Sequence, residues 1–248
     1  MIKEAIDKYL DKHALASASG VRPFRVVLFD MDGVLYDSMP HHAVAWQKAM
    51  TQFGLDMTAA DAYATEGARG IDTIRQFVRR QKGTDISQEA AQRIYDVKTQ
   101  IFHNMGEAVI FDGVYRLMRQ IKDAGLQIGV VTGSGQRPLI QRLLTDFGEF
   151  VDEQHIVTAY DVDHGKPAPD PYLMGLCKAG NLQPHEGIVV ENAPLGVRAG
   201  VAAGCFTLAV NSGPLPDEAL TGEGAHLLFP SIADLSEHWA EFGLSGSR

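Results

Sequence analysis

The sequence predicts an α/β protein whose core is a Rossmann-like, three-layer arrangement around a mostly parallel sheet. Short apolar runs recur along the chain, and stretches with helical spacing of apolar residues separate them. Runs of this kind are typical of strands that are buried on both faces of a parallel sheet. Their alternation with helices indicates βαβ units, which place helices on both faces of that sheet. A third observation is one long interval, 38–107, that holds no comparable apolar run.

The first expected strand runs from Arg25 to Asp30, an apolar segment closed by an acid. Five similar segments follow it, at 126–132, 156–159, 187–191, 206–210 and 226–229. The helices expected between these strands are 113–124, 136–147, 171–180 and 194–203. Ahead of the first strand, apolar residues at helical spacing predict a short amphipathic helix over 3–15. A loose link at 16–20 would complete an N-terminal helical extension, 1–20.

The interval 38–107 interrupts the alternation of strands and helices. Glycines divide it, and four of its segments read as helices: 40–53, 58–64, 71–82 and 87–104. We therefore predict a helical cap domain at 38–107, inserted after the first strand into a core domain made of 21–37 and 108–248. Such an insert can cover the carboxyl edge of the sheet, where open α/β sheets bind ligands. Trp46 and Phe53 are expected in the apolar core of the cap, and Gly106 is a candidate hinge.

Composition and charge exclude several classes of protein. The chain has 248 residues, and 45% of them are hydrophobic, which is too apolar for a disordered chain. Its 31 acidic and 22 basic residues give a net charge of −9, which argues against nucleic-acid binding because that needs clustered basic charge. No apolar run approaches the roughly 18 residues of a membrane helix, so no membrane association is expected.

The sequence also leads to expectations about cellular location, the two cysteines and the oligomeric state. Charged residues in the first 20 positions argue against a signal peptide, so the cytoplasm is the expected location. Cys177 and Cys205 form no CxxC pair, so two buried free thiols are expected, with a disulfide or a metal site as the alternative. The sequence does not fix the oligomeric state, and a monomer is the expectation.

The strongest chemical signal is the segment Asp30-Met-Asp32-Gly at the end of the first strand. Two carboxylates there open into the ligand crevice and can act as nucleophile, as acid/base group or as ligands of a hard metal ion. For an isolated pair of this kind, an exposed loop is the alternative. The apolar strand before the pair and the Gly-Val-Leu after it favour a functional site.

Three further signals lie at strand ends or in a stiffened loop. Thr132 and Ser134 offer hydroxyls, beside glycine N–H groups and ahead of a helix N-terminus that can face an anion. Lys166 stands in a proline-stiffened loop and could neutralise phosphoryl charge, although a solvated surface lysine is the simpler interpretation. Glu191 and Asn192 end another strand and carry oxygen ligands suited to Mg²⁺, while Asn192 could instead cap the next helix.

In this order, the four elements resemble the motifs of the haloacid dehalogenase superfamily of phosphotransferases. FDMDG stands for the first motif, VVTGS for the second, GKPAPDPY for the third and VVENAPLG for the fourth. The resemblance covers nearly all of residues 24–235, and the helical insert resembles the α-helical cap of the beta-phosphoglucomutase-like branch. It implies phosphoryl transfer, Mg²⁺ as cofactor and a small phosphorylated substrate as partner.

The resemblance also implies roles for the matching residues. Asp30 would attack phosphorus and form an aspartyl-phosphate, and Asp32 would serve as general acid and then as general base. Mg²⁺ would offset the repulsion between carboxylate and phosphate, held by the Asp30 carboxylate, the Asp32 backbone carbonyl and Asn192. The groups that would hold the phosphoryl oxygens are Thr132, the backbone of Gly133 and Ser134, and Lys166.

One departure from the family pattern concerns the metal. Many relatives carry an acidic pair in the fourth motif, whereas the second member here is Asn192, a weaker ligand for Mg²⁺. Either Glu191 contributes more to the metal, or an acid comes from elsewhere. Glu66 in the cap is such an acid, and we expect it to reach the metal when the cap closes. A solvated loop residue is the alternative for Glu66.

The loop that contains Glu66 also bears on the substrate. Glu66 and Gly70 align with positions at which beta-phosphoglucomutases resemble each other in placing basic residues that bind the distal phosphate of the sugar, and Arg69 is adjacent but displaced. His42 matches the family position that approaches the leaving group, and Lys98 matches its usual basic companion. An exposed histidine and a solvated helix lysine are the alternatives for these two.

The choice of reaction follows from the cap loop, which lacks the basic residues that bind the distal phosphate in beta-phosphoglucomutases. A mutase must hold a phosphosugar intermediate, whereas an acidic cap loop fits a small leaving group that is wrapped in Mg²⁺. The Glu66 loop, Glu191-Asn192 in the fourth motif and the string VVENAPLGV together resemble the inorganic pyrophosphatases of this branch most. This resemblance implies a Mg²⁺-dependent phosphohydrolase with pyrophosphate as first-choice substrate. A beta-phosphoglucomutase or a sugar-phosphate phosphatase is the alternative. A non-catalytic sensor of a phospho-ligand is remote, because Asp30, Asp32, Thr132 and Lys166 are all present.

Overall fold

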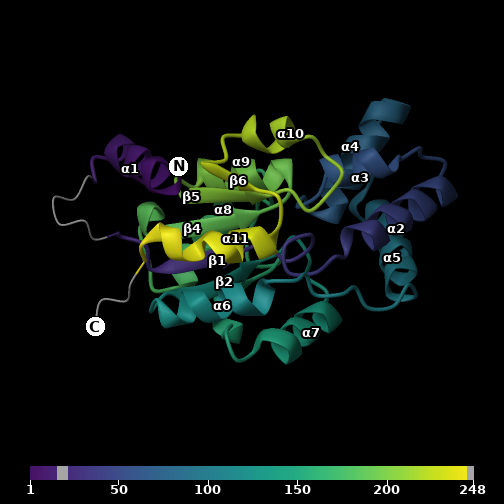
Figure 1. Cartoon of the computed structure of the whole chain (residues 1–248). Coiled ribbons are helices and arrows are strands. Elements are labelled where there is room, and N and C mark those ends of the chain that lie inside the picture. Colours follow the sequence, from purple (N-terminus) through teal and green to yellow (C-terminus); the bar gives the residue numbers. More distant parts are fainter. Residues whose placement is uncertain (16–21, 245–248) are drawn as a thin grey trace.

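The computed structural model describes residues 1–15 and 22–244 and contains one six-stranded sheet. Its strand order is β3-β2-β1-β4-β5-β6, and every pairing between neighbours is parallel (Figure 1). The predicted three-layer α/β fold is therefore confirmed. The strands are β1 (Val26–Phe29), β2 (Gln127–Val131), β3 (Ile156–Val157), β4 (Gly187–Glu191), β5 (Phe206–Val210) and β6 (Leu227–Phe229).

Alternate side chains of the strands pack on opposite faces of the sheet. Val27 and Phe29 of β1 belong to one buried cluster, and Val26 and Leu28 belong to a second. Because both faces are covered, β1 is apolar at successive positions instead of alternating with polar residues. The first cluster includes side chains of α1 (Ile2–Lys12), α6 (Val114–Asp123), α7 (Arg137–Phe147) and α11 (Ile232–His238). The second includes side chains of α8 (Asp170–Lys178) and α9 (Pro194–Ala202).

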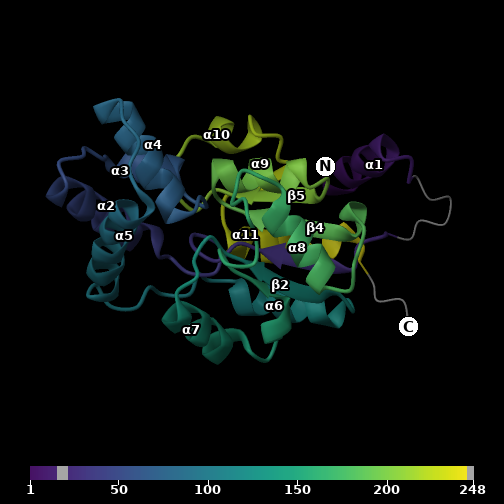
Figure 2. The same cartoon turned by 180° about the vertical axis from the view of Figure 1, so that it is seen from behind.

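Four helices between β1 and β2 stand apart from the sheet, and we call them the cap (Figures 1 and 2). They are α2 (Met39–Gln52), α3 (Ala59–Ala64), α4 (Gly70–Lys82) and α5 (Gln88–His103). The cap has an apolar cluster of its own that includes Trp46, Met50 and Phe77. Phe53, in contrast, is 37% exposed, so its predicted place in this core is wrong. It follows α2 at a turn and is not on the buried face of that helix.

The N-terminal helix α1 is part of the core, at the end of the sheet away from the cap (Figure 1). The Tyr9 hydroxyl donates a hydrogen bond of 2.6 Å to the backbone carbonyl of Gly204, and Ile6 is fully buried. Helix α1 also packs against the short C-terminal helix η3 (Trp239–Phe242). The helix ends at Lys12 instead of the predicted position 15, and the predicted link at 16–20 lies outside the described residues.

Several features of the core differ from the prediction. Short helices that the sequence did not reveal lie near the C-terminus, namely α10 (Asp217–Thr221) and α11. Cys205 is a buried free thiol, as expected, but Cys177 is exposed, so the prediction of two buried thiols holds for only one of them. In the part of the chain that the structure describes, no helix is both long and apolar enough to cross a membrane.

Candidate active site

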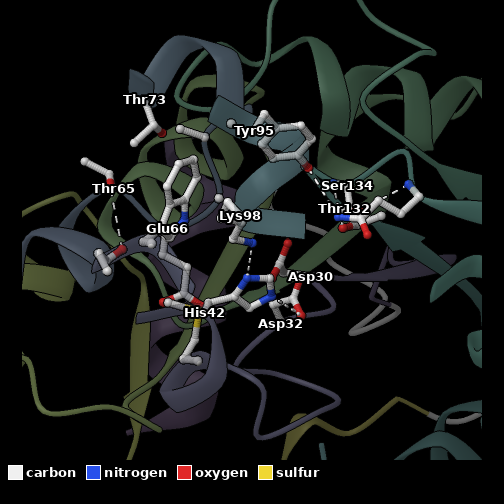
Figure 3. A pocket seen from close by; sticks show the side chains of 18 residues that line it. Asp30, Asp32, His42, Thr65, Glu66, Thr73, Tyr95, Lys98, Thr132 and Ser134 are labelled. Carbon is white, nitrogen blue, oxygen red and sulfur yellow. Dashed lines mark hydrogen bonds and ion pairs between the residues drawn. The ribbon is translucent and has the colours of Figure 1, made fainter. Parts of the chain in front are cut away.

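The candidate site lies at the carboxyl edge of the sheet, where three adjacent strands end. Strand β1 pairs with β2 on one side and with β4 on the other, so that Phe29 is opposite both Val130 and Val190. The residues that follow these strands therefore meet at one edge. Asp30 and Asp32 come from β1, Thr132 to Ser134 from β2, and Glu191 and Asn192 from β4. Figure 3 shows several of these side chains facing one cavity.

Lys166 connects two of the strand ends from the loop before α8. Its Nζ atom contacts Asp30 Oδ1, lies 2.6 Å from Glu191 Oε1 and donates a 3.0 Å bond to the Val131 carbonyl. Lys166 and Asp30 are each 4% exposed, and Glu191 is fully buried. Lys166 is therefore not a solvated surface lysine. Although burial opposes the charge, the two carboxylates raise the pKa of Lys166 and keep its ammonium protonated.

Asp30 is held among other charges that shift its ionisation. Burial, together with the nearby Glu191 carboxylate, raises the pKa of Asp30 to about 8, while Lys166 acts in the opposite direction. One ammonium thus lies between two buried carboxylates. A cation at the site would favour the ionised form of Asp30, because it would offset the repulsion between the two carboxylates.

Glu191 uses both of its oxygens for hydrogen bonds within the protein. Oε1 accepts from Lys166 and from the Tyr172 hydroxyl at 2.6 Å, and Oε2 accepts from the backbone N–H groups of Asn192 and Ala193 at 3.1 and 3.2 Å. An ionised carboxylate has about four lone-pair positions. All four are taken, which argues against the role as metal ligand considered for Glu191. Its carboxylate instead fixes Lys166 and the turn into α9.

Asp32 is held by residues of the linker and of the cap. The Ser38 hydroxyl donates a 2.5 Å bond to its Oδ1, and His42 Nε2 lies 3.2 Å from the same oxygen, without the alignment of a hydrogen bond. Burial alone would raise the pKa of Asp32. His42, Ser38 and Lys98 outweigh that effect and lower the pKa to about 2. Asp32 is therefore ionised in this arrangement.

His42 and Lys98 come together at the cap side of the cavity. Lys98 Nζ lies 2.5 Å from His42 Nδ1, and both side chains are buried (Figure 3). Because an ammonium group only donates, Nδ1 is the acceptor and the ring proton is placed on Nε2, toward Asp32. Burial lowers the pKa of Lys98 to about 8, and burial and the Lys98 charge lower the pKa of His42. Neither residue is the solvated side chain considered as the alternative.

The loop after β2, from Thr132 to Ser134, carries hydroxyl and backbone N–H donors, and we call it the cradle. Thr132 and Ser134 are buried, and the Ser134 backbone N–H donates a 3.0 Å bond to Thr132 Oγ1. A Cβ atom on Gly133 would come within 2.8 Å of the Gly67 carbonyl in the cap. Glycine at this position therefore lets the cap loop approach the cradle. Backbone N–H groups at the start of this turn are suited to phosphoryl oxygens.

Glu66 reaches from the cap to the end of β4. It is 7% exposed, and its Oε1 accepts a 2.8 Å hydrogen bond from the Asn192 side-chain amide. Glu66 is thus not a solvated loop residue, and Asn192 is not the helix cap, since α9 is preceded by Ala193. Burial, and the carboxylates of Asp30 and Glu191 nearby, raise the pKa of Glu66.

The donors around Asn192 fit a hard cation. Asn192 Oδ1 is buried and has no hydrogen-bond partner, and Asp30 and Glu66 bring carboxylates to the same place. Within residues 1–15 and 22–244, no three His, Cys, Asp or Glu side chains form a metal site by themselves. A metal here would therefore draw on mixed oxygen donors, which Mg²⁺ accepts: carboxylate, amide and the Asp32 backbone carbonyl.

A cavity of about 70 Å³ lies between the cap and the core and is partly open to the outside. The core contributes Asp30, Asp32 and the cradle, and the cap contributes His42, Lys98 and the Glu66 loop. Lys98 is the only lysine or arginine among the lining residues. The sequence did not indicate Ser38, Tyr172 or Arg69 as contributors. Ser38 bonds to Asp32, six residues before it, whereas the partners of Tyr172 and Arg69 lie 19 and 94 residues away, so that only the fold brings those pairs together.

A parallel α/β core with a helical cap, an aspartate paired with a buried lysine and a hydroxyl-and-amide cradle defines a phosphoryl-transfer enzyme of the capped α/β class. The chain belongs to the haloacid dehalogenase-like hydrolase family, whose model matches residues 27–210. Within that family it is beta-phosphoglucomutase-like, of the group that contains phosphatases and phosphomutases.

Relatives of known sequence and structure extend this assignment. Hexitol phosphatase A of Escherichia coli is 34% identical over 186 residues, which cover 75% of this chain and 82% of that protein. Beta-phosphoglucomutase of Bacillus subtilis is 26% identical, over 90% of this chain and 99% of that protein. A solved structure from Bacteroides vulgatus, named provisionally as a beta-phosphoglucomutase, has a TM-score of 0.91 and 45% identity and covers 98% of this chain and 96% of its own. The similarity to pyrophosphatases stays a prediction.

Proposed function

We propose that the chain is a Mg²⁺-dependent phosphohydrolase that forms an aspartyl-phosphate on Asp30, with inorganic pyrophosphate as first-choice substrate. The observation that carries the substrate choice is the buried Glu66 carboxylate, 2.8 Å from the Asn192 amide. An acid at this place repels the distal phosphate of a sugar bisphosphate. A second phosphoryl group that arrives with bound Mg²⁺ is compatible with it. A cytoplasmic location and a monomeric state belong to the same proposal.

The reaction would proceed in two displacements. An Asp30 carboxylate oxygen attacks phosphorus, the bond to the leaving phosphate breaks, and the resulting aspartyl-phosphate is hydrolysed by water. Lys166 and the cradle of Thr132, Gly133 and Ser134 would stabilise the charge on the transferring oxygens. Bound Mg²⁺ would supply neutralisation of phosphoryl charge, held by Asp30, the Asp32 carbonyl and Asn192 with Glu66 beside it.

The low pKa of Asp32 favours a substrate whose leaving group departs without being protonated. A carboxyl group with a pKa of about 2 donates a proton poorly near neutral pH. A sugar alkoxide needs that proton, because it is a strong base. A departing phosphate is a much weaker base than an alkoxide, so it needs far less assistance. Lys98, as the single cation that lines the cavity, would then contact the leaving phosphate, with His42 orienting Lys98 and Asp32.

A panel of substrates tests this proposal. With Mg²⁺ present, phosphate release should be fastest from pyrophosphate, compared with glucose 1-phosphate, fructose 1-phosphate and 2-deoxyglucose 6-phosphate. Release should stop when a chelator removes the metal. Pyrophosphate that stays intact beside a rapidly hydrolysed hexose phosphate would remove it as the substrate.

A phosphatase of small sugar or polyol phosphates is the second candidate. The relatives favour it, because they include hexitol phosphatase A and a fructose-1-phosphate phosphatase of Escherichia coli. The mutase is tested with the same panel: interconversion of glucose 1-phosphate and glucose 6-phosphate without phosphate release would establish it. The buried Glu66 carboxylate and the single lysine among the residues that line the cavity favour pyrophosphate over both alternatives.

Replacement of Glu66 tests its link to the metal. We expect Glu66→Ala to weaken apparent Mg²⁺ affinity about 10- to 100-fold, the usual effect of losing a group that orients or joins a metal shell. Calorimetric titration with Mg²⁺ measures this directly, without turnover. Glu89→Ala is a matched control, because Glu89 is an exposed acid of the cap. Equal Mg²⁺ affinity of Glu66→Ala and wild type would exclude Glu66 from the metal site.

A further inference from the structure

The cap loop that carries Glu66 continues into a second contact with the core. Gly67 has a φ of +83°, and a Cβ atom there would lie 3.3 Å from Lys166 Cδ. The loop therefore packs against the lysine as well as against the cradle at Gly133. The same loop ends at Arg69, the residue immediately before α4.

Arg69 crosses from the cap to the core. Its Nε donates a 2.7 Å bond to Asp72 Oδ2 in the first turn of α4, and one terminal nitrogen donates a 2.6 Å bond to the Asp163 carbonyl. A Cβ atom on Gly165 would come within 2.6 Å of Arg69 Cγ, so glycine makes room for the arginine. Asp163 and Gly165 belong to the loop that carries Lys166.

The direction of the guanidinium excludes it from the substrate cavity. Arg69 is absent from the residues that line the 70 Å³ cavity, and it lines instead a separate small gap with Gly165 and Lys166. Asp72 binds the Nε atom of Arg69, so that the terminal nitrogens of the guanidinium point to the loop that contains Asp163 and Lys166. The positive charge of the cap loop thus faces a backbone carbonyl of the core instead of a substrate phosphate.

We propose that Arg69 is a positioning residue that latches the cap onto the Lys166 loop. The latch favours the closed arrangement and holds the loop that places Lys166 beside Asp30. This inference rests on the proposed function only in taking the closed arrangement as the reactive one. A hydrogen bond from a charged donor is strong enough to change a closing equilibrium about tenfold after allowance for partial exposure.

Cap closure can be followed through tryptophan fluorescence. The chain has two tryptophans, and Trp46 is 8% exposed and lines the cavity. In a Trp239→Phe background, Trp46 should report closure on titration with Mg²⁺ and beryllium trifluoride, a mimic of the phosphoryl group on Asp30. Arg69→Ala should require about tenfold more ligand and leave the cap more open, and Arg69→Lys should recover part of the loss. Circular dichroism verifies that each variant is folded.

Steady-state kinetics give an independent readout. Because only the closed fraction is competent, KM should rise about tenfold in Arg69→Ala, and kcat should change less. Arg75→Ala is the matched control, since Arg75 lies on α4 and bonds to Gln88 within the cap at 2.6 Å. Its closure and KM should equal those of wild type.

The outcomes separate the latch from the proposed substrate. A weakened closure in Arg69→Ala supports the latch even if pyrophosphate is not the substrate, because the fluorescence titration uses none. Unchanged closure together with unchanged KM would overturn the latch. A loss confined to substrates with a second phosphate, with normal closure, would also overturn it, because Arg69 would then be a substrate-binding residue.

Discussion

Asp30→Asn should abolish turnover, with a fall in kcat of at least about 10,000-fold. The Asp30 carboxylate is the group at the end of β1 that Lys166 contacts, and an amide at that position is too weak a nucleophile to form the covalent intermediate. Phosphate release from the best substrate of the panel measures the loss. Trapping of a phosphorylated protein, which should occur in wild type and not in the variant, provides the direct chemical readout.

The same variant should keep its fold and change its pH dependence. Burial raises the pKa of Asp30 to about 8, so the folded protein holds a proton that the unfolded chain releases near pH 4. Without metal, wild-type stability should therefore fall from about pH 4 to about pH 8, relative to Asp30→Asn, which lacks this titration. Thermal unfolding across that range measures the difference. A variant with substantial activity, or with a collapsed fold, would contradict the role of Asp30.

Lys166→Met should remove both activity and stability. Lys166 is the only cation in contact with the buried carboxylates of Asp30 and Glu191 in the described structure. Its loss leaves two buried acids uncompensated, a change that typically costs about 3–5 kcal/mol. Denaturant unfolding measures this cost. Lys122→Met is the matched control, because that lysine is exposed near the end of α6 and should be close to neutral.

A double variant separates the two effects. Lys166→Met combined with Glu191→Gln removes one of the unpaired charges, so it should recover part of the lost stability. Activity should stay absent, because the ammonium beside Asp30 that stabilises the transferring phosphoryl group is missing. Equal stability of the single and double variants would show that the Glu191 charge does not set the cost of removing Lys166.

The arrangement of the strand ends was predictable because it depends on topology more than on detailed packing. Asp30, Thr132 and Asn192 each follow an apolar run, and parallel strands bring such positions to one edge. The resemblance to a family then related the residues to a reaction. Buried placement of Glu66 in the cap was also anticipated, since the loop aligns with one that faces the substrate in relatives.

The partners of Glu191 could not be predicted from the sequence. Two of its four hydrogen bonds depend on Tyr172 in α8 and on Lys166 from a separate loop, and nothing in the local sequence reveals these two partners. Phe53 was misplaced because periodicity does not reveal where a helix ends against solvent. The sequence shows the positive charge of Arg69, but the direction of its guanidinium depends on the bond to Asp72 and on the space at Gly165.

The central place of β1 has a consequence for the biosynthesis of the protein. Val26 pairs with Gln127 on one side and with Gly187 on the other, so β1 leaves the ribosome well before either neighbour exists. The cap is contiguous in the chain and has its own apolar cluster, so we expect it to fold while β1 still waits for partners. Asp30 is made early, but its surroundings at the sheet edge are complete only after β4 has been synthesised. A prematurely terminated chain would therefore carry a folded cap without phosphoryl chemistry.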